Sequence, residues 1–229
     1  MYNDHMPNTS FEIRVCESCG LRYPLVEGHP FGTRCPTCMG ETRVILRRKL
    51  MIEPDFVSHP KQIHRKQQEE RRTNSAVLLD NIRSAWNVGS ILRSVDGFGF
   101  RHAYLCGITP TADNEAVMKT ALGAEESVPW SYHRDAVRLV NGLKVEGWKV
   151  YALEEDPRAM DISQAESVPY TSEHNVLILG NEVTGVDPGL LDLCDGIFYI
   201  PMRGEKKSFN VAIAFGIVAY ALSSRRVGG

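Results

Sequence analysis

The sequence contains no apolar run that approaches the roughly 18 residues of a membrane span. The first residues, Met1 to His5, also lack the basic and the apolar regions of a secretory signal peptide. Hydrophobic residues still make up 43% of the 229 residues, which is enough for a packed core. We therefore expect a globular, cytoplasmic protein with no membrane partner.

Net charge is also small, at −2, but it is unevenly distributed. Residues 1–75 hold 12 Lys and Arg against 9 Asp and Glu, whereas residues 76–229 hold 14 against 19. Local positive surface is enough to attract phosphate, so the acidic total does not exclude an RNA partner. The basic residues form two clusters, the first with Arg43, Arg47, Arg48 and Lys49, and the second with Lys61, Arg65, Lys66, Arg71 and Arg72. A solvated helix face would explain the second cluster equally well.

Cysteine is scarce outside two pairs, Cys16 with Cys19 and Cys35 with Cys38, which are separated by fifteen residues. This spacing is typical of a zinc ribbon, because one tight turn aims both sulfurs of a pair at a tetrahedral ion. We expect Gly20 and Gly40 to let the backbone reverse after each pair. Two disulfides or a redox C-x-x-C motif are the alternatives, and a reducing compartment disfavours both.

The expected metal site is structural. A segment of about forty residues cannot bury a self-sufficient core, so the metal would supply much of its folding free energy. Four thiolates leave no coordination position for an activated water. We expect His29, between the pairs, to lie at the surface, and Cys106 and Cys194 to be small core residues.

Three segments are expected along the chain: a zinc ribbon (1–50), a basic and partly helical linker (51–75), and a larger domain (76–229). In the larger domain short β-rich runs alternate with helical stretches, which predicts an α/β fold with a mainly parallel sheet covered on both faces. Ligands of such sheets bind beyond the carboxyl ends of the strands. The expected strands include 76–79, 103–106, 149–153, 176–179 and 197–200, and the expected helices include 89–98, 135–146, 188–194 and 209–223.

Polar residues gather at the expected strand ends in three separated motifs. The first holds Asn81-Ile82-Arg83, Asn87-Val88-Gly89 and Arg93, the second holds Leu179-Gly180-Asn181-Glu182 and Gly185, and the third holds Ile200-Pro201-Met202 and Ser208-Phe209-Asn210. Their order and spacing resemble the three motifs of the SpoU-type (TrmH-like) RNA ribose 2′-O-methyltransferases of the SPOUT superfamily. The resemblance runs from about Leu78 to about Ala221, roughly two thirds of the chain.

The resemblance implies a C-terminal trefoil knot, which is an exception to the rule that chains avoid knots. It implies a homodimer, since the active sites of this superfamily are typically completed across a two-fold interface. It also implies S-adenosylmethionine as cofactor, and a ribose 2′-hydroxyl in tRNA or rRNA as the methyl acceptor. A cationic methyl donor needs no metal, so the ribbon and catalysis should be separable.

The same resemblance assigns roles to individual residues. Arg93 is the central catalytic residue, and because a guanidinium stays protonated below about pH 12, we expect it to grip a phosphate and polarise the hydroxyl. The other expected catalytic residues are Asn87, Glu182, Ser208 and Asn210. The expected cofactor-binding residues are Leu153, Gly180, Ile200, Met202 and Phe209. Phe209 stands where the family usually has Leu, which leaves the adenine pocket's shape open.

Ordinary structural roles compete with these assignments. Asn87 and Ser208 could each cap a helix, Arg93 could form a surface ion pair, and Glu182 could sit near a helix N-terminus for electrostatic reasons alone. Two other functions also remain open. A SPOUT enzyme that methylates a base nitrogen would lack the Asn-to-Arg first motif, and a catalytically silent RNA-binding protein could dispense with the polar residues.

Overall fold

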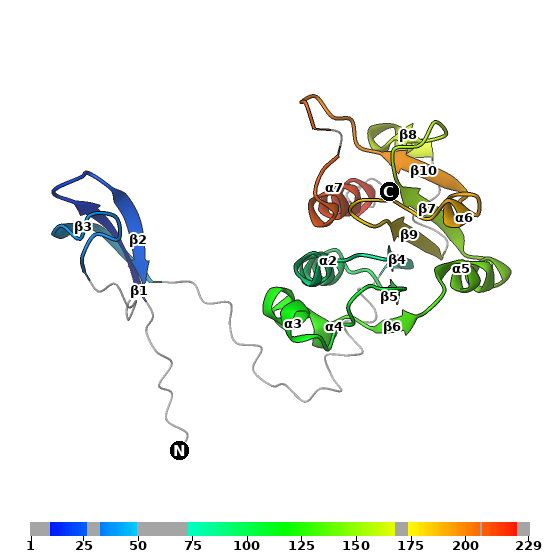
Figure 1. The fold of residues 1–229 in the computed structure, drawn as a ribbon, viewed down its shortest axis with the longest axis horizontal. Coiled ribbons are helices and arrows are strands. Elements are labelled where there is room, and N and C mark those ends of the chain that lie inside the picture. Colours follow the sequence, from blue (N-terminus) through cyan, green and yellow to red (C-terminus); the bar gives the residue numbers. More distant parts are fainter. Residues whose placement is uncertain (1–9, 27–32, 50–72, 168–173, 207, 224–229) are drawn as a thin grey trace, which may run out of the picture. The chain divides into compact units, whose positions relative to one another are not determined.

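The computed structural model describes residues 10–26, 33–49, 73–167, 174–206 and 208–223, and the chain separates into two compact units, Met1–His64 and Arg65–Gly229 (Figure 1). His29 and the basic cluster between Lys61 and Arg72 lie outside the described residues. The expected boundaries of the ribbon and the linker therefore stay predictions.

The first unit is a small antiparallel sheet. Strands β1 (Ser10–Cys16), β2 (Arg22–Val26) and β3 (Thr42–Lys49) lie in the order β2-β1-β3. Among the described residues of this unit only Arg14, Cys16 and Cys35 are buried. So small an apolar core cannot offset the chain entropy lost on folding, so this unit needs a further source of stability. Two of its three buried side chains are cysteines of the paired motifs.

The second unit contains a seven-stranded sheet in the order β6-β5-β4-β9-β7-β10-β8, and every pairing of neighbouring strands is parallel. Each residue of β4 and β9, at the centre, is buried, as expected for strands covered on both faces. The predicted α/β fold with a mainly parallel sheet is confirmed. The strands are β4 (Ser75–Asp80), β5 (His102–Cys106), β6 (Trp130–His133), β7 (Lys149–Leu153), β8 (Met160–Asp161), β9 (Asn175–Leu179) and β10 (Gly196–Tyr199).

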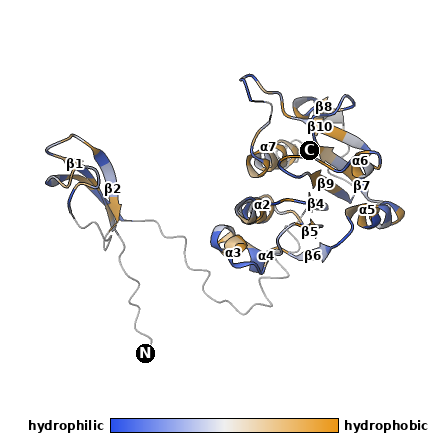
Figure 2. Ribbon diagram, in the orientation of Figure 1, coloured by the Kyte–Doolittle hydropathy of each residue, from blue (hydrophilic) through white to orange (hydrophobic). Residues whose placement is uncertain are grey.

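Helices cover both faces of this sheet (Figure 1). Helices α2 (Ala85–Gly97), α3 (Glu115–Ala121), α4 (Ala124–Ser127) and α7 (Val211–Ser223) pack on one face. Helices α5 (Ala136–Val145) and α6 (Pro188–Leu191) pack on the other, and a 3₁₀ helix (Ile162–Ser167) follows β8. In Figure 2 strand β9 has the hydrophobic colour, whereas α5 carries both colours because only one of its sides meets the sheet. No helix of the described ranges is long and apolar enough to cross a membrane.

Several helix ends differ from the sequence expectation. Helix α2 begins at Ala85, because Oγ of Ser84 accepts the backbone N–H of Asn87 and caps the helix four residues earlier than predicted. Helix α6 ends at Leu191 and α7 begins at Val211. Helices α3 and α4 and strands β6 and β8 were not anticipated, since short elements leave little periodicity. The expected trefoil knot stays a prediction.

Gly89 of the first motif serves the packing of two helices. A Cβ at this position would lie 2.0 Å from Oγ1 of Thr120 and 2.5 Å from the carbonyl oxygen of Val117, both in α3. Only glycine lets α2 and α3 approach this closely. The space that Gly89 leaves beside α2 is therefore occupied by α3.

Candidate functional site

A pocket of about 300 Å³ opens at the carboxyl ends of three neighbouring strands, β9, β7 and β10. All five expected cofactor-binding residues line it, and so do Glu182, Ser208 and Asn210. The lining comes from the residues after each strand and from the first turn of α7. Its members are Leu153, Glu154, Glu155, Leu179, Gly180, Asn181, Glu182, Val183, Gly185, Tyr199, Ile200, Met202, Ser208, Phe209, Asn210, Val211 and Ala214.

The second motif forms a closed loop on one wall of this pocket. The backbone N–H of Asn181 donates to the carbonyl of Gly185 at 3.0 Å, and the N–H of Gly185 donates back to the carbonyl of Asn181 at 2.9 Å. A Cβ at Gly180 would lie 2.2 Å from the backbone nitrogen of Val186. Gly180 is thus required by a backbone contact inside the loop, before any ligand is considered.

Asn181 joins the second motif to the first. Its Nδ2 donates to the backbone carbonyl of Asn81 at 2.7 Å. Asn81 itself has a positive φ of 56°, a conformation that asparagine tolerates better than most residues, and its Oδ1 accepts the backbone N–H of Ile108 at 3.1 Å. These bonds hold the loops after β4, β5 and β9 together.

Glu182 lies at the N-terminus of helix α2, 95 residues or more away in sequence. Its carboxylate accepts hydrogen bonds from the backbone N–H groups of Arg83 at 2.9 Å and Ser84 at 3.1 Å, and from Nδ2 of Asn87 at 2.9 Å. Burial raises the pKa of Glu182, but these donors outweigh it and hold the pKa below its ordinary value. Glu182 is therefore an ionised anchor at neutral pH and a weak base.

Asn87 continues this chain of hydrogen bonds into the third motif. Its Oδ1 accepts a hydrogen bond from Nδ2 of Asn210 at 3.0 Å. Asn87 lies inside α2, and the expectation that it caps the helix is wrong because Ser84 has that role. Glu182, Asn87 and Asn210, one from each motif, thus form a continuous hydrogen-bonded relay, called the three-motif relay below.

Asn210 also begins the last helix. Its Oδ1 accepts the backbone N–H of Ala212 at 3.0 Å, and its carbonyl accepts the N–H of Ala214 at 2.8 Å. The possible capping role of Ser208 is therefore filled by Asn210. Ser208 is exposed and lines the pocket.

Arg93 stands apart from the other expected catalytic residues. It is exposed on α2 and is not among the residues that line the pocket. It lies six positions after Asn87 on the helix, which is about 9 Å along the axis and about 240° around it. Within one chain, the fold brings together four of the five expected catalytic residues and leaves Arg93 outside.

Glu154 was missed by the sequence analysis. It follows β7 directly, and its Oε2 accepts the backbone N–H of Val186 at 2.8 Å. Its position after a strand that ends in Leu153, already an expected pocket residue, was the available signal.

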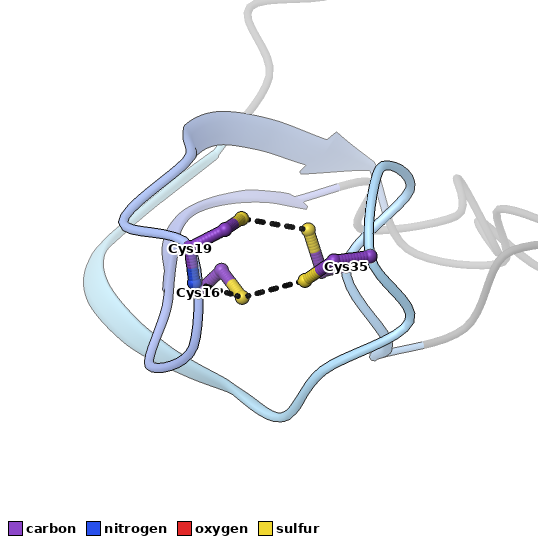
Figure 3. A group of neighbouring side chains, drawn as sticks. Cys16, Cys19 and Cys35 are labelled. Carbon is purple, nitrogen blue, oxygen red and sulfur yellow. Dashed lines mark hydrogen bonds between the residues drawn. The ribbon is translucent and has the colours of Figure 1, made fainter.

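The four paired cysteines converge in the first unit (Figure 3). Sγ of Cys16 lies 3.4 Å from Sγ of Cys38, Sγ of Cys19 lies 3.7 Å from Sγ of Cys35, and all four sulfurs lie within 4.8 Å of one another. Four sulfurs at 2.3 Å from a tetrahedral zinc ion would be about 3.8 Å apart. The cluster therefore has the size of a four-thiolate metal site, and all four cysteines are free of disulfides.

The two cysteine turns share one backbone pattern. Cys16 and Cys35 each donate an N–H to the residue five positions on and accept an N–H from the residue four positions on. The residue four positions on has a positive φ in both turns: Gly20 at 75° and Met39 at 58°. Our expectation that Gly40 reverses the backbone is wrong. A Cβ at Gly40 would lie 2.6 Å from Oγ of Ser18 and 3.2 Å from Sγ of Cys16, so Gly40 is required by close packing.

A backbone hydrogen bond favours the thiolate of Cys16. The N–H of Cys19 donates to Sγ of Cys16 at 3.4 Å and is the largest of several contacts that together lower the pKa of Cys16 to about 6, although burial raises it. A metal binds the thiolate, so this hydrogen bond favours the form of the side chain that coordinates.

Comparison with known proteins places this geometry in a family. The profile of the SpoU rRNA Methylase family matches residues 74–220. The chain is 32% identical over 161 residues to the 23S rRNA (guanosine(2553)-2′-O)-methyltransferase RlmP of Bacillus subtilis, and the match covers 69% of this chain and 62% of that protein. It is 32% identical over 159 residues to the tRNA (guanosine(18)-2′-O)-methyltransferase of Thermus thermophilus, and that match covers 69% of this chain and 78% of that protein.

The fold of this chain is also similar to that of a solved structure. The AdoMet-bound rRNA methyltransferase of Sinorhizobium meliloti is 25% identical and superimposes with a TM-score of 0.62, over 67% of this chain and 57% of that one. The matched region contains all three motifs and the pocket they line. This chain belongs to the SpoU rRNA Methylase family.

Proposed function

We propose that this chain transfers a methyl group from S-adenosylmethionine to a ribose 2′-hydroxyl of tRNA or rRNA, in the cytoplasm. The observation that carries the proposal is the three-motif relay, which brings Glu182, Asn87 and Asn210 together at the edge of the pocket. The named relatives act on both RNA classes, and this chain spans 62% of the rRNA enzyme and 78% of the tRNA enzyme.

The pocket fits the proposed cofactor in size and in chemistry. Its volume falls at the lower end of the range for small-molecule sites, which is roughly 300–1,000 Å³. Apolar side chains such as Ile200 and Phe209 offer contacts for an adenosine. The described lining holds three carboxylates, Glu154, Glu155 and Glu182, and no Lys, Arg or His, which suits a cationic ligand.

When bound, the cofactor supplies an electrophilic methyl group on a cationic sulfur. The protein's task is to hold the hydroxyl oxygen in line behind that methyl carbon, because positioning alone can lower the barrier by several kcal/mol. Arg93, which stays protonated, grips the adjoining phosphate and polarises the hydroxyl. Asn210 and Ser208 line the pocket and orient the ribose, and Asn87 holds Asn210 in place.

We assign Arg93 to the pocket of a second copy, so the active enzyme is a homodimer. A single chain leaves Arg93 outside the pocket, and α7 exposes 56% of Ile213 and 66% of Tyr220, an apolar surface suited to a two-fold contact. Mixing Arg93→Ala chains with Gly180→Ala chains tests this assignment. About a quarter of the wild-type activity should return, because half of the dimers are mixed and each mixed dimer has one intact site. If Arg93 acts within its own chain, the mixture will stay inactive.

The activity is tested with purified protein, labelled S-adenosylmethionine, and RNA from cells with and without the gene. A ribose-methylated nucleotide is identified by a backbone linkage that resists alkali. Wild-type protein should form this linkage and Arg93→Ala protein should not, although both bind the cofactor. Label found on a base nitrogen, or in no RNA at all, would contradict the proposal.

We propose Zn²⁺ as the ion held by Cys16, Cys19, Cys35 and Cys38. A closed four-thiolate site with little buried core around it calls for a structural metal. Elemental analysis of purified protein should find about one zinc per chain. A metal-free protein with four reduced thiols and a folded first unit would rule this out.

A further inference from the structure

We propose that Glu154 is a positioning residue for the cofactor pocket: its carboxylate holds the loop of residues 180–186 in the conformation that opens the pocket. This inference rests on the proposed function, because the pocket is taken to be the S-adenosylmethionine site. Glu154 belongs to none of the three motifs.

Both carboxylate oxygens of Glu154 accept backbone hydrogen bonds. Oε2 accepts the N–H of Val186 at 2.8 Å, where the 180–186 loop ends, and Oε1 accepts the N–H of Glu155 at 3.0 Å. The backbone N–H of Glu154 in turn donates to the carbonyl of Phe198 in β10 at 2.9 Å. One residue thus connects the carboxyl ends of β7 and β10 to the loop after β9, and all three segments line the pocket.

The 180–186 loop packs closely around this carboxylate. Gly185 has a φ of 74°, and a Cβ there would lie 2.4 Å from Oε2 of Glu154. On the other side, a Cβ at Gly180 would lie 2.6 Å from the carbonyl oxygen of Gly185. The two glycines therefore leave the space in which the loop folds onto Glu154, and a side chain at position 185 would displace the carboxylate.

Loss of the Glu154 carboxylate would destabilise this conformation of the loop. Val186 is buried and its N–H points at a charged acceptor, so losing that acceptor leaves a backbone donor without its partner. The loop contributes Gly180, Asn181 and Glu182 to the pocket, and movement of the loop changes the shape of the site. Glu154 is not among the residues assigned above to the ribose hydroxyl or to its phosphate. Its loss should therefore weaken cofactor binding more than it slows transfer at saturation.

The test compares three variants by calorimetric titration with S-adenosylmethionine and with S-adenosylhomocysteine. Glu154→Ala should weaken binding by about 10- to 100-fold, the range expected when a hydrogen bond to a charged group is removed. Glu154→Gln keeps one acceptor oxygen, for the Val186 N–H, but its NH2 then faces the N–H of Glu155, so its loss of affinity should be clearly smaller than that of Glu154→Ala and greater than zero. Glu155→Ala removes a charge from the same pocket wall without removing the bond to Val186, and its effect should be smaller than that of Glu154→Ala.

Two further readouts separate positioning from general stability and from a failed cofactor assignment. In steady-state assays Glu154→Ala should raise KM for S-adenosylmethionine and leave kcat within about threefold. Hydrogen exchange of the Val186 amide, measured without ligand, should be slow in wild type and in Glu154→Gln and fast in Glu154→Ala. If Glu154→Ala folds poorly, Gly185→Ala provides the same test, because its Cβ displaces the carboxylate of Glu154. It should then show the weaker cofactor binding expected for Glu154→Ala.

Several outcomes would overturn the inference: wild-type affinity in Glu154→Ala, an equal loss in Glu154→Gln, or unchanged exchange of the Val186 amide. If wild-type protein binds neither ligand, the proposed function fails instead, and the exchange experiment still decides whether Glu154 holds the loop.

Discussion

Nδ2 of Asn210 donates a hydrogen bond to Oδ1 of Asn87 at 3.0 Å, although 123 residues separate the two in sequence. Asn87 in turn donates to Glu182, so helix α2, the loop after β9 and the start of α7 share one hydrogen-bond network. The network spans the N-termini of helices α2 and α7 and one wall of the pocket.

This network predicts non-additive mutant effects. Asn87→Ala and Asn210→Ala should each slow single-turnover methyl transfer by about 2- to 10-fold, since each removes an exposed hydrogen bond worth about 0.5–1.5 kcal/mol. The double variant should lose much less than the product of the two, because the singles break the same bond. Cofactor affinity should fall with Asn210→Ala, whose residue lines the pocket, more than with Asn87→Ala. Multiplicative losses would show that the two side chains act independently.

Met39 predicts a variant of the metal site with higher affinity. Its φ of 58° is a left-handed conformation that costs a residue with a Cβ about 1 kcal/mol relative to glycine. Met39→Gly should therefore raise zinc affinity by about fivefold in competition with a chromophoric chelator. Gly20→Ala, the matched change in the other turn, should lower it by a similar factor. The prediction fails if Met39→Gly binds zinc more weakly than wild type.

Asp80 predicts a pH-dependent contribution to stability. It is 2% exposed at the end of β4, and burial, together with the nearby Asp187 carboxylate, raises its pKa above its ordinary 3.8 despite hydrogen bonds from the Asp187 N–H and from Nδ2 of Asn81. A raised pKa in the folded state means that the folded protein binds the proton more tightly than the unfolded chain does. This contribution is complete below pH 3.8 and is lost as pH rises through the raised pKa.

The measurement is chemical denaturation of wild type and Asp80→Asn at a series of pH values. The free energy of unfolding of wild type should fall relative to that of Asp80→Asn as pH rises above 3.8. A difference between the two proteins that stays constant, or grows in favour of wild type with rising pH, would contradict the assigned direction.

Strand β3 predicts an electrostatic RNA contact. Arg43 and Arg48 are exposed, whereas Arg47 forms an ion pair with Glu12. Arg43→Ala and Arg48→Ala should each weaken RNA binding and lower the slope of log affinity against log salt by about 0.7–0.9, the decrement expected when one phosphate is no longer neutralised. Arg47→Ala is the matched control and should change the slope less. Equal slopes in all four proteins would assign the ribbon a partner other than RNA.

The sequence alone determined the features that depend on short-range pattern. Alternating β-rich and helical runs predicted the parallel sheet, because a strand covered on both faces is apolar along most of its length, as β9 is from Val176 to Leu179. The spacing of Cys16, Cys19, Cys35 and Cys38 predicted the cluster, because two intervening residues constrain a turn that aims both sulfurs the same way. The resemblance to a family named five residues as expected cofactor contacts, four of them in the motifs and Leu153 at the end of an earlier strand, and all five line the pocket.

Tertiary structure decided which of these residues meet and which backbone conformations they adopt. Local pattern left the helix caps ambiguous, and packing chose Ser84 over Asn87 and Asn210 over Ser208. Glu154 carries no motif, and its bond to Val186 exists only because β7 and β9 are neighbours in the sheet. At 3.6 residues per turn, the six positions from Asn87 to Arg93 place the two side chains on different sides of α2. Only the tertiary structure shows that Arg93 is not among the residues that line the pocket.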